Sequence, residues 1–433
     1  MKTLIVIISF ALVSCIKVST GEGNLQLREV DKALIQKSEI RQSKDFWEAM
    51  QNLDLEFAEQ FSDSSQEKEF AQVVRSIMDG DYANAEAPLE NLVKTSSDSL
   101  FIENSGRLLT GIYLRTYQWQ KLIDLDESLP KGIDDMGTID MVKAWQQQEP
   151  EVIHYPQNPL VVPSEKSMSG VPMIQVMVNG IEQTFWIDTG AEFTVLASDI
   201  AEKCGVKPLT DIPSRVGTAT DKKIGLWAGS IENLKIQDLL IENHPVFIIG
   251  KVDLEFRILK IFKILKIDGI IGWNAIQNLK IELNYANDSV TFNKPKLEDA
   301  GTRNFHYLTQ PFVTVLDTTG TALHFFMDTG ANTSSLYDPA YSVFDTSAAE
   351  IKNAMVGGAG GFQRITQLRL EKQSLVLGNT RINFSALDGK TPLGELDEGF
   401  ILYDGMLGSD VAQEGVLILD FQNGWCELKT VQN

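Results

Sequence analysis

Two aspartates stand in closely similar contexts in the second half of the chain. The segment FWIDTGAEFTVL carries Asp188, and the segment FFMDTGANTSSL carries Asp328. Two carboxyl groups about 3 Å apart cannot both ionise, so they share one proton and titrate as a unit. The ionised member can take a proton from water while the neutral member donates to a carbonyl oxygen. Such a pair would hydrolyse an amide bond without a metal ion, a cofactor or a covalent intermediate.

The residues after each aspartate fit this chemistry. Thr189 and Thr329 supply hydroxyl groups that can bond across a two-fold axis. Gly190 and Gly330 have no Cβ, so backbone amides and a substrate can come close to the carboxylates. The apolar residues before each aspartate would bury the base of the site and lower the local dielectric constant. One such motif alone would favour a turn aspartate at a strand end, and the duplicated context argues against that use.

A second landmark repeats at almost the same distance. The segments DGIIGWNAI and DGMLGSDVA each contain Asp-Gly, two apolar residues and Gly. Gly272 follows Asp188 by 84 positions, and Gly408 follows Asp328 by 80 positions. Two separate landmarks at nearly equal spacing indicate an internal duplication.

Strand-like alternation precedes both aspartates. Residues 171–178 (VPMIQVMV) are followed by Asn179-Gly180, a pair that favours the type I′ turn of a β-hairpin, and then by IEQTFWID. The second copy reads PFVTVLD, then Thr-Thr-Gly, then TALHFFMD. Each Asp-Thr-Gly is therefore predicted to end the second strand of a hairpin, where a strand meets a turn.

At these residues the chain resembles a known family. Two Asp-Thr-Gly-Ala motifs, each followed by an apolar-apolar-Gly segment, resemble aspartic proteases, and the Ala resembles the retropepsin form of the motif. The resemblance covers residues 166–433 and implies an all-β bilobal aspartic protease fold built from two retropepsin-like lobes, at 166–297 and 298–433. Because both lobes lie in one chain, a monomer suffices. The implied site residues are the catalytic dyad Asp188 and Asp328, the interlocking threonines Thr189 and Thr329, their neighbours Gly190 and Gly330, and Gly272 and Gly408 at the ends of strands beneath the active-site loops.

The resemblance also implies flaps that close over a bound peptide, one between each motif and its glycine. The candidates are residues 216–225 in the first lobe and the glycine-rich residues 356–366 in the second. The flap candidates are Thr218, Ala219, Gly358, Gly360 and Gly361. The chain departs from pepsins because neither segment has a counterpart of the pepsin flap tyrosine and the N-terminal half is unlike a short basic propeptide.

The N-terminus reads as a signal peptide. Residues 1–15 (MKTLIVIISFALVSC) place one Lys before an apolar stretch that is too short for a permanent membrane span. Leu12 to Cys15 resembles a bacterial lipobox, which implies lipidation of Cys15 and a lipid-anchored protein of the bacterial cell envelope. A simple secretory signal with an incidental cysteine is the alternative.

Residues 16–149 are predicted to form an all-α domain. Apolar residues recur at three- and four-residue steps, as in Phe70, Val73, Val74 and Ile77. The pattern resembles tetratricopeptide (TPR-like) helical hairpins, and an irregular helical bundle is the alternative. We expect this domain to serve as a scaffold or to bind a protein partner. Residues 150–165 contain four prolines and are predicted to be a linker or an edge strand.

Composition excludes several other functions. The net charge of −21 repels nucleic acid, so a nucleic-acid partner is not expected. No C-x-x-C pair and no H-E-x-x-H motif is present, so neither a thiol redox motif nor a histidine metal site is predicted. Cys204 and Cys426 could form a disulfide or remain buried free thiols.

Four further features are ambiguous in the sequence. Glu192 and Asn332 follow the two motifs and are interpreted as helix-start or rim residues. His324 shares a strand face with Asp328 and is interpreted as a packed core histidine. In residues 254–268 a basic residue recurs every three positions among Ile, Leu and Phe. This stretch could be an amphipathic helix that seeks an acidic partner or a lipid surface, or a surface helix or strand pair.

The sequence therefore predicts an aspartic endopeptidase that acts on peptide or protein substrates. A catalytically silent envelope lipoprotein that holds peptides or proteins is the alternative, because folds outlive functions. A protease kept silent by its N-terminal domain is a third hypothesis.

Overall fold

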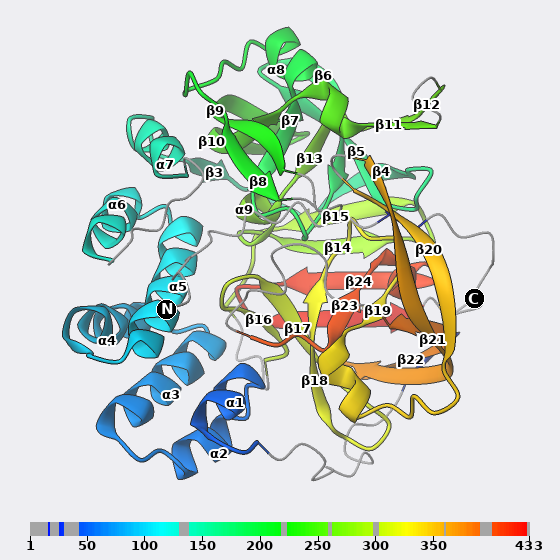
Figure 1. The fold of residues 1–433 in the computed structure, drawn as a ribbon. Coiled ribbons are helices and arrows are strands. Elements are labelled where there is room, and N and C mark those ends of the chain that lie inside the picture. The colour runs from blue at the N-terminus through cyan, green and yellow to red at the C-terminus, as the bar shows by residue number, and fades with distance from the viewer. Residues whose placement is uncertain are drawn as a thin grey trace.

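The chain combines a layer of helices with two large β-sheets (Figure 1). The computed structural model describes residues 16–17, 26–29, 43–129, 138–217, 223–258, 262–297, 303–358, 361–389 and 401–430. Cys15 and the rest of the predicted signal peptide lie outside these residues. Within the described residues, no helix has both the length and the apolar character needed to cross a membrane.

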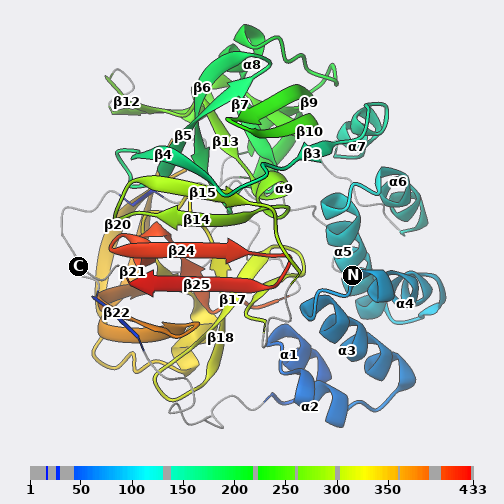
Figure 2. The same ribbon diagram turned by 180° about the vertical axis from the view of Figure 1, so that it is seen from behind.

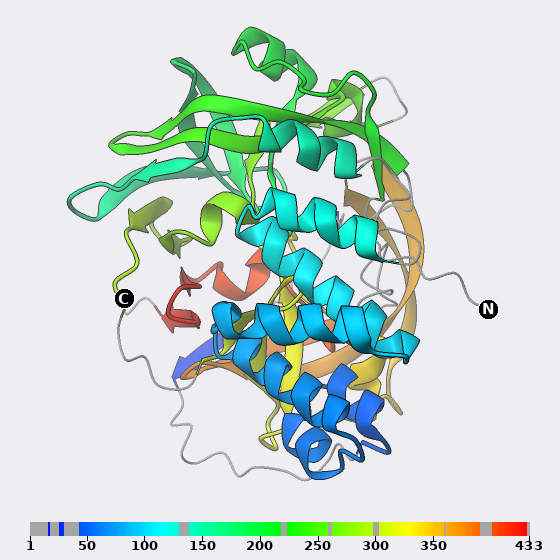
Figure 3. The same ribbon diagram turned by 90° about the vertical axis from the view of Figure 1, so that its left-hand side faces the viewer.

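The helices follow one another along one side of the molecule, as Figure 3 shows. They are α1 (Phe46–Gln51), α2 (Leu55–Gln60), α3 (Ser65–Met78), α4 (Tyr82–Thr95), α5 (Ser99–Arg115), α6 (Trp119–Ser128) and α7 (Thr138–Gln146). The predicted periodicity is confirmed in α3, because Phe70, Val73, Val74 and Ile77 are all buried. Each helix packs on the next one in the chain. Both helical hairpins and an irregular bundle pack in this way, so the resemblance to tetratricopeptide units stays a prediction.

The region predicted to be helical also contains two short strands. β1 (Ile16–Lys17) pairs with β20 (Glu350–Gly358), and β2 (Gln26–Glu29) pairs with β22 (Thr380–Gly389). The prediction of an all-α segment from residue 16 is wrong for these residues. Both strands bind at edges of a distant sheet, where backbone groups accept a further strand, and such pairing leaves no mark in the local sequence.

A 13-stranded sheet contains most strands of the first half of the β region. Its strands are β3 (Val152–His154), β4 (Leu160–Lys166), β5 (Pro172–Val178), β6 (Ile181–Ile187), β7 (Thr194–Ala197), β8 (Ser214–Gly217), β9 (Lys223–Ile236), β10 (Leu239–Ile249), β13 (Gly269–Ile271), β14 (Lys280–Asn284), β15 (Ser289–Asn293), β24 (Gly415–Asp420) and β25 (Trp425–Thr430). The predicted linker is therefore part of this sheet. β3 lies at an edge on β10, whereas β4 pairs with β15 through its first half and with β5 through its second.

A 10-stranded sheet contains the second half. Besides β1, β2, β20 and β22, its strands are β16 (Phe305–Tyr307), β17 (Pro311–Leu316), β18 (Ala322–Met327), β19 (Ser335–Leu336), β21 (Gly361–Leu377) and β23 (Gly405–Leu407). The two halves of the β region are not cleanly divided at residue 298. β24, from the end of the chain, pairs with β14, so β15, β14, β24 and β25 lie side by side (Figure 2).

The predicted hairpins and the predicted duplication are confirmed. β5 and β6 pair in antiparallel fashion, and the turn residues Asn179 and Gly180 have φ angles of 49° and 82°. Both angles are positive, as a type I′ turn requires. β17 and β18 form the second hairpin. In the first copy, β13 runs parallel to β6 and antiparallel to β7. In the second copy, β23 runs parallel to β18 and antiparallel to β19.

The basic and apolar stretch at residues 254–268 forms a strand pair. A short 3₁₀-helix (Lys251–Leu254) leads into β11 (Glu255–Ile258), which pairs with β12 (Phe262–Lys266). The amphipathic-helix interpretation is wrong, and the strand-pair alternative holds. The stretch is rich in Ile and Phe, which favour strands over helices. Lys266 forms ion pairs with Asp199 and Asp268, so this end of the strand pair is held by residues of the first half of the β region.

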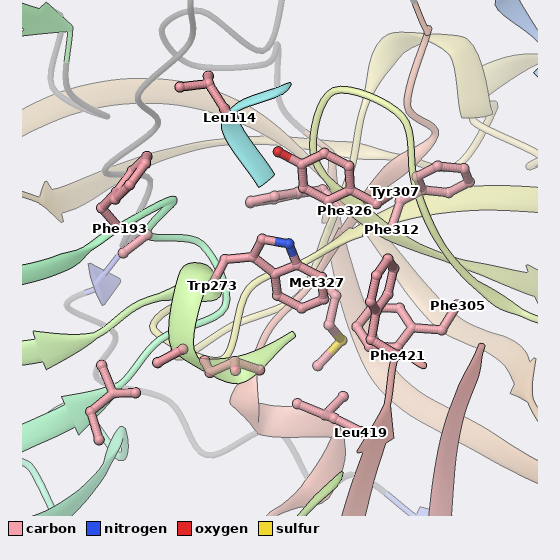
Figure 4. Packing of buried hydrophobic residues seen from close by; sticks show 14 of the residues in the cluster. Leu114, Phe193, Trp273, Phe305, Tyr307, Phe312, Phe326, Met327, Leu419 and Phe421 are labelled. Atoms are coloured by element: carbon pink, nitrogen blue, oxygen red, sulfur yellow. The ribbon is translucent and has the colours of Figure 1, made fainter. Parts of the chain in front are cut away.

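An aromatic cluster joins the helices to both sheets (Figure 4). The ring of Trp273 lies parallel to that of Tyr307 at 5.9 Å and edge-on to that of Phe421 at 5.0 Å. Leu114 of α5 reaches the same cluster (Figure 4). Cys204 and Cys426 are both buried free thiols, which was one of the two alternatives.

Candidate active site

The two Asp-Thr-Gly loops interlock through their threonines. The Thr189 amide donates to Thr329 Oγ1 at 3.0 Å, and the Thr329 amide donates to Thr189 Oγ1 at 3.0 Å. Each hydroxyl in turn donates to the opposite strand: Thr189 Oγ1 to the Met327 carbonyl at 2.6 Å and Thr329 Oγ1 to the Ile187 carbonyl at 2.9 Å. All four bonds are buried, so they set the relative position of the two loops.

Backbone amides orient the two carboxyl groups. Gly190 N–H donates to Asp188 Oδ1 at 2.8 Å. Asp328 Oδ1 accepts from Gly330 N–H at 2.9 Å and from Ala331 N–H at 3.0 Å. Each loop therefore holds its own carboxyl group.

Each carboxyl group also lies over the glycine of the opposite loop. A Cβ on Gly190 would lie 2.7 Å from Asp328 Oδ1, and a Cβ on Gly330 would overlap the Asp188 carboxyl group. These positions accept only glycine because any side chain would displace the opposite aspartate.

The electrostatics of the pair require a proton. Both aspartates are buried. Burial raises the pKa of Asp328 well above its ordinary value, and the charge of Asp188 and a hydrogen bond to it raise that pKa further. Hydrogen bonds from the Ala331 and Gly330 amides lower the pKa of Asp328, but by less than burial and Asp188 raise it. Two buried carboxyl groups that interact in this way cannot both be ionised at low cost, so the raised pKa of Asp328 fits a pair that shares one proton.

The nearly equal spacings from motif to glycine, 84 and 80 positions, place a strand beneath each loop. The Asp188 amide donates to the Ile271 carbonyl at 3.1 Å, and the Asp328 amide donates to the Leu407 carbonyl at 3.0 Å. Gly272 and Gly408 come directly after these strands. A Cβ on Gly272 would overlap the backbone of Phe193, and a Cβ on Gly408 would lie 2.8 Å from the Thr333 carbonyl carbon.

The flap candidates are only partly described. β8 and β9 form one hairpin, and β20 and β21 form the other. Gly358 and Gly361 pair with each other near the end of the second hairpin. Thr218, Ala219 and Gly360 lie outside the described residues. A flap function for either hairpin stays a prediction.

Sequence reasoning missed a polar pair behind each loop. Thr194 and Ser334 each come six residues after their aspartate, and Asn274 and Asp410 each come two residues after their glycine. Thr194 N–H donates to Asn274 Oδ1 at 2.8 Å. Ser334 donates to Asp410 through N–H at 2.8 Å and through its hydroxyl at 2.7 Å. Alignment of the two copies at equal offsets would have found both pairs.

Glu192 is not a rim residue. It is buried, and the Tyr307 hydroxyl donates to its Oε1 at 2.7 Å. Burial raises the pKa of Glu192 to about 7, against the opposing effects of the Tyr307 hydrogen bond and the charge of Arg115. His324 is buried, with Nδ1 3.3 Å from Thr314 Oγ1, as a packed core histidine would be. Asn332 is half-buried in the loop after the second motif.

Comparisons with known proteins relate the segment around the first Asp-Thr-Gly loop to a known family. No curated protein matches the chain. Among solved structures, a retropepsin-like aspartic protease from Rickettsia conorii is 17% identical and covers 34% of this chain and 97% of its own, with a TM-score of 0.22. An aspartic proteinase from Irpex lacteus is 12% identical and covers 63% of this chain and 97% of its own, with a TM-score of 0.41. Residues 174–275, which include Asp188 and Gly272, match the family model described as aspartyl protease, so this segment is similar to that family.

Proposed function

We propose that the protein is an aspartic endopeptidase with two lobes and one shared catalytic pair, Asp188 and Asp328. The observation that carries this proposal is the reciprocal geometry of the two loops. Each threonine bonds to the other loop, and each carboxyl group lies over the glycine of the other loop. The family match supports the first lobe, and the repetition of the same contacts supports the second.

The proposed reaction uses only the one shared proton and a water molecule. The ionised carboxylate takes a proton from a water molecule while the oxygen of that water forms a bond to the carbonyl carbon of the peptide. The neutral carboxyl group gives its proton to the carbonyl oxygen, which leaves a neutral tetrahedral diol. Return of a hydroxyl proton to the carboxylate and transfer of a proton to the nitrogen break the C–N bond. The products are a carboxylic acid and an amine, and the pair again holds one proton.

Substrate access requires a conformational change. Neither aspartate is exposed in this conformation. A peptide must displace the segments that cover the carboxyl groups, and the hairpins β8–β9 and β20–β21 are the proposed movable parts. The second candidate function, a silent peptide-binding protein that uses the same cleft, would need the same opening.

Digestion of a peptide library from pH 3 to pH 8 separates the two candidates. We expect cleavage that a pepstatin-type inhibitor blocks and that Asp188→Asn and Asp328→Asn both abolish. Binding of peptides without cleavage by the wild type would leave only the silent peptide-binding function. Cleavage that survives in either purified variant would refute the assignment of the pair.

We also propose that the protein is lipid-anchored in a bacterial cell envelope through Cys15. The support is the resemblance of residues 12–15 to a lipobox. Metabolic labelling with a fatty acid and fractionation of cells test it. The wild type should carry the label and sediment with membranes, and Cys15→Ser should lose the label. An unlabelled wild type would leave only the simple secretory signal.

A further inference from the structure

A buried row of polar side chains runs from the end of the helical layer to the first Asp-Thr-Gly loop. Glu151 comes shortly after α7, and its Oε2 forms a short hydrogen bond with His244 Nδ1. His244 lies on β10, and its Nε2 is 2.8 Å from Thr194 Oγ1. The side chains of His244 and Glu151 are 0% and 6% exposed, so solvent cannot replace either partner.

The inner end of this row reaches the strand beneath Asp188. Thr194 Oγ1 accepts from Gly272 N–H at 3.3 Å and lies 3.2 Å from Asn274 Oδ1. Asn274 Nδ2 donates to the Pro245 carbonyl at 2.8 Å, which sets its amide orientation. Gly272 directly follows Ile271, whose carbonyl accepts the Asp188 amide. Four hydrogen bonds and one peptide unit therefore connect Glu151 to the backbone amide of Asp188.

Donor and acceptor counting gives His244 a defined role. Its Nδ1 must donate, because the carboxylate of Glu151 only accepts. Thr194 has one hydroxyl proton, and Asn274 Oδ1 already accepts from the Thr194 amide at 2.8 Å. With Nδ1 donating to Glu151, His244 Nε2 can accept the Thr194 hydroxyl proton, so every group in the row has a partner.

In the second lobe, a hydroxyl group also links a carboxylate to the amide of the glycine, and no histidine lies between them. Gly408 N–H donates to Ser334 Oγ at 3.0 Å, and Ser334 Oγ donates to Asp410 at 2.7 Å. The carboxylate lies two residues after the glycine, where the first lobe has the neutral Asn274. The first lobe therefore receives its carboxylate from outside the duplicated unit, through Glu151 and His244.

Glu151 also connects this row to the helices. The Tyr117 hydroxyl, from the segment between α5 and α6, donates to Glu151 Oε2 at 3.4 Å. Asn243 Nδ2, next to His244, donates to the Pro150 carbonyl at 3.2 Å. The segment that leaves the helical layer is thus held at the histidine that supports the catalytic loop.

We propose that Glu151 and His244 are positioning residues for Asp188, and that they couple the helical layer to the first catalytic loop through Thr194 and Gly272. This proposal rests on the proposed peptidase function, because it assigns the two residues to the support of that reaction. They touch no reacting atom. Their loss should impair the chemical step and leave peptide affinity almost unchanged.

The test compares Glu151→Gln and His244→Gln in the full chain with a matched control. Glu242→Gln removes the negative charge from a second Glu–His pair, in which Glu242 Oε2 lies 2.7 Å from His154 Nε2, on the β3–β10 pairing. That pair is exposed, with side chains 53% and 39% accessible. We expect the two buried variants to lower kcat by roughly ten- to hundred-fold, the cost of a misplacement of about 1 Å, with little change in KM. The control should match the wild type. The variant that combines Glu151→Gln and His244→Gln should lower kcat no further than His244→Gln alone, because the two residues act through the same row of hydrogen bonds.

A second measurement does not depend on activity. Amide hydrogen exchange should speed up at residues 188–196 and 269–276 in both buried variants and stay unchanged at residues 328–336 and 405–412. If the wild type cleaves no peptide, the proposed function fails and the exchange pattern alone decides the coupling. Unchanged exchange at the first loop, or an equal effect of Glu242→Gln, would overturn the proposal. So would a rise in KM at constant kcat in the buried variants.

Discussion

The shared proton controls both the proposed chemistry and the stability of the fold at the residue scale. The pKa of Asp328 is raised from its ordinary value of 3.8, so the folded protein favours the protonated form. That contribution to stability is complete below pH 3.8 and is lost as the pH rises through the raised pKa. The residue that the proposed reaction needs therefore costs stability at neutral pH, a common compromise at active sites.

Asp328→Asn should separate these two effects. We expect kcat to fall by at least roughly 10²- to 10⁴-fold, because one partner of the proton transfer is gone. The free energy of unfolding of the variant should rise relative to that of the wild type between pH 4 and pH 8, because Asn has no proton to lose. Urea denaturation of both proteins at the two pH values measures this difference. A difference that does not change with pH would contradict the raised pKa.

Ionisation of Glu192 gives the free energy of unfolding a second dependence on pH, which can be measured without an activity assay. Its pKa is about 7 in the folded protein and 4.5 ordinarily. Its contribution to stability is complete below pH 4.5 and is lost as the pH rises through about 7, on the order of 3 kcal/mol in total. Glu192→Gln keeps an acceptor for the Tyr307 hydroxyl and should remove this loss. Urea titrations at pH 4, 6 and 8 test it, and parallel pH profiles of variant and wild type would rule it out.

At the scale of elements, the loops tolerate no added volume where they cross a strand. A Cβ on Gly272 would overlap the Phe193 backbone, whereas a Cβ on Gly225 would meet only Pro213 Cβ, at 3.3 Å, and Cγ, at 3.6 Å. Gly272→Ala should therefore lower the free energy of unfolding by about 1–3 kcal/mol or more and lower kcat. Gly225→Ala should cost less in both measurements. Equal losses of unfolding free energy and of kcat in the two variants would show that the close approach of Gly272 to the Phe193 backbone does not limit residue size at this position.

The sequence predicts elements that are encoded locally, and it fails for contacts that join distant segments. Asn179-Gly180 predicts its hairpin because the turn chemistry lies in adjacent residues. The duplicated motifs predict that two loops meet, because one fold is repeated. The burial of Glu192 depends on Tyr307, which lies 115 residues later in the chain. The strand pairing of residues 16–17 and 26–29 and the support of His244 by Glu151 depend on contacts of the same kind, and no local pattern records them.

At the scale of the whole molecule, the helical layer packs against the first Asp-Thr-Gly loop as well as on the sheets. Trp145 of α7 stacks on Phe193 at 4.8 Å, five residues after Asp188, and its Nε1 donates to the Gly229 carbonyl at 2.8 Å. His306 of β16 is buried, and its Nδ1 donates a hydrogen bond to the Met78 carbonyl of α3 at 3.0 Å. The helices thus contact both halves of the β region, an arrangement that favours a structural layer over a detachable inhibitor.

Trp145→Ala tests whether the helices and the β region unfold together. The variant loses the stacking on Phe193 and the bond to Gly229, so we expect the free energy of unfolding to fall by about 3–5 kcal/mol. Helix content and near-ultraviolet signals should still be lost in a single transition, and kcat should fall, because the catalytic loop loses its backing. A separate early transition of the helices with full or increased peptidase activity would instead favour a protease that its N-terminal domain keeps silent. The fragment 160–433 makes the same distinction: a structural layer predicts that it is unstable, and an inhibitory domain predicts that it is stable and more active.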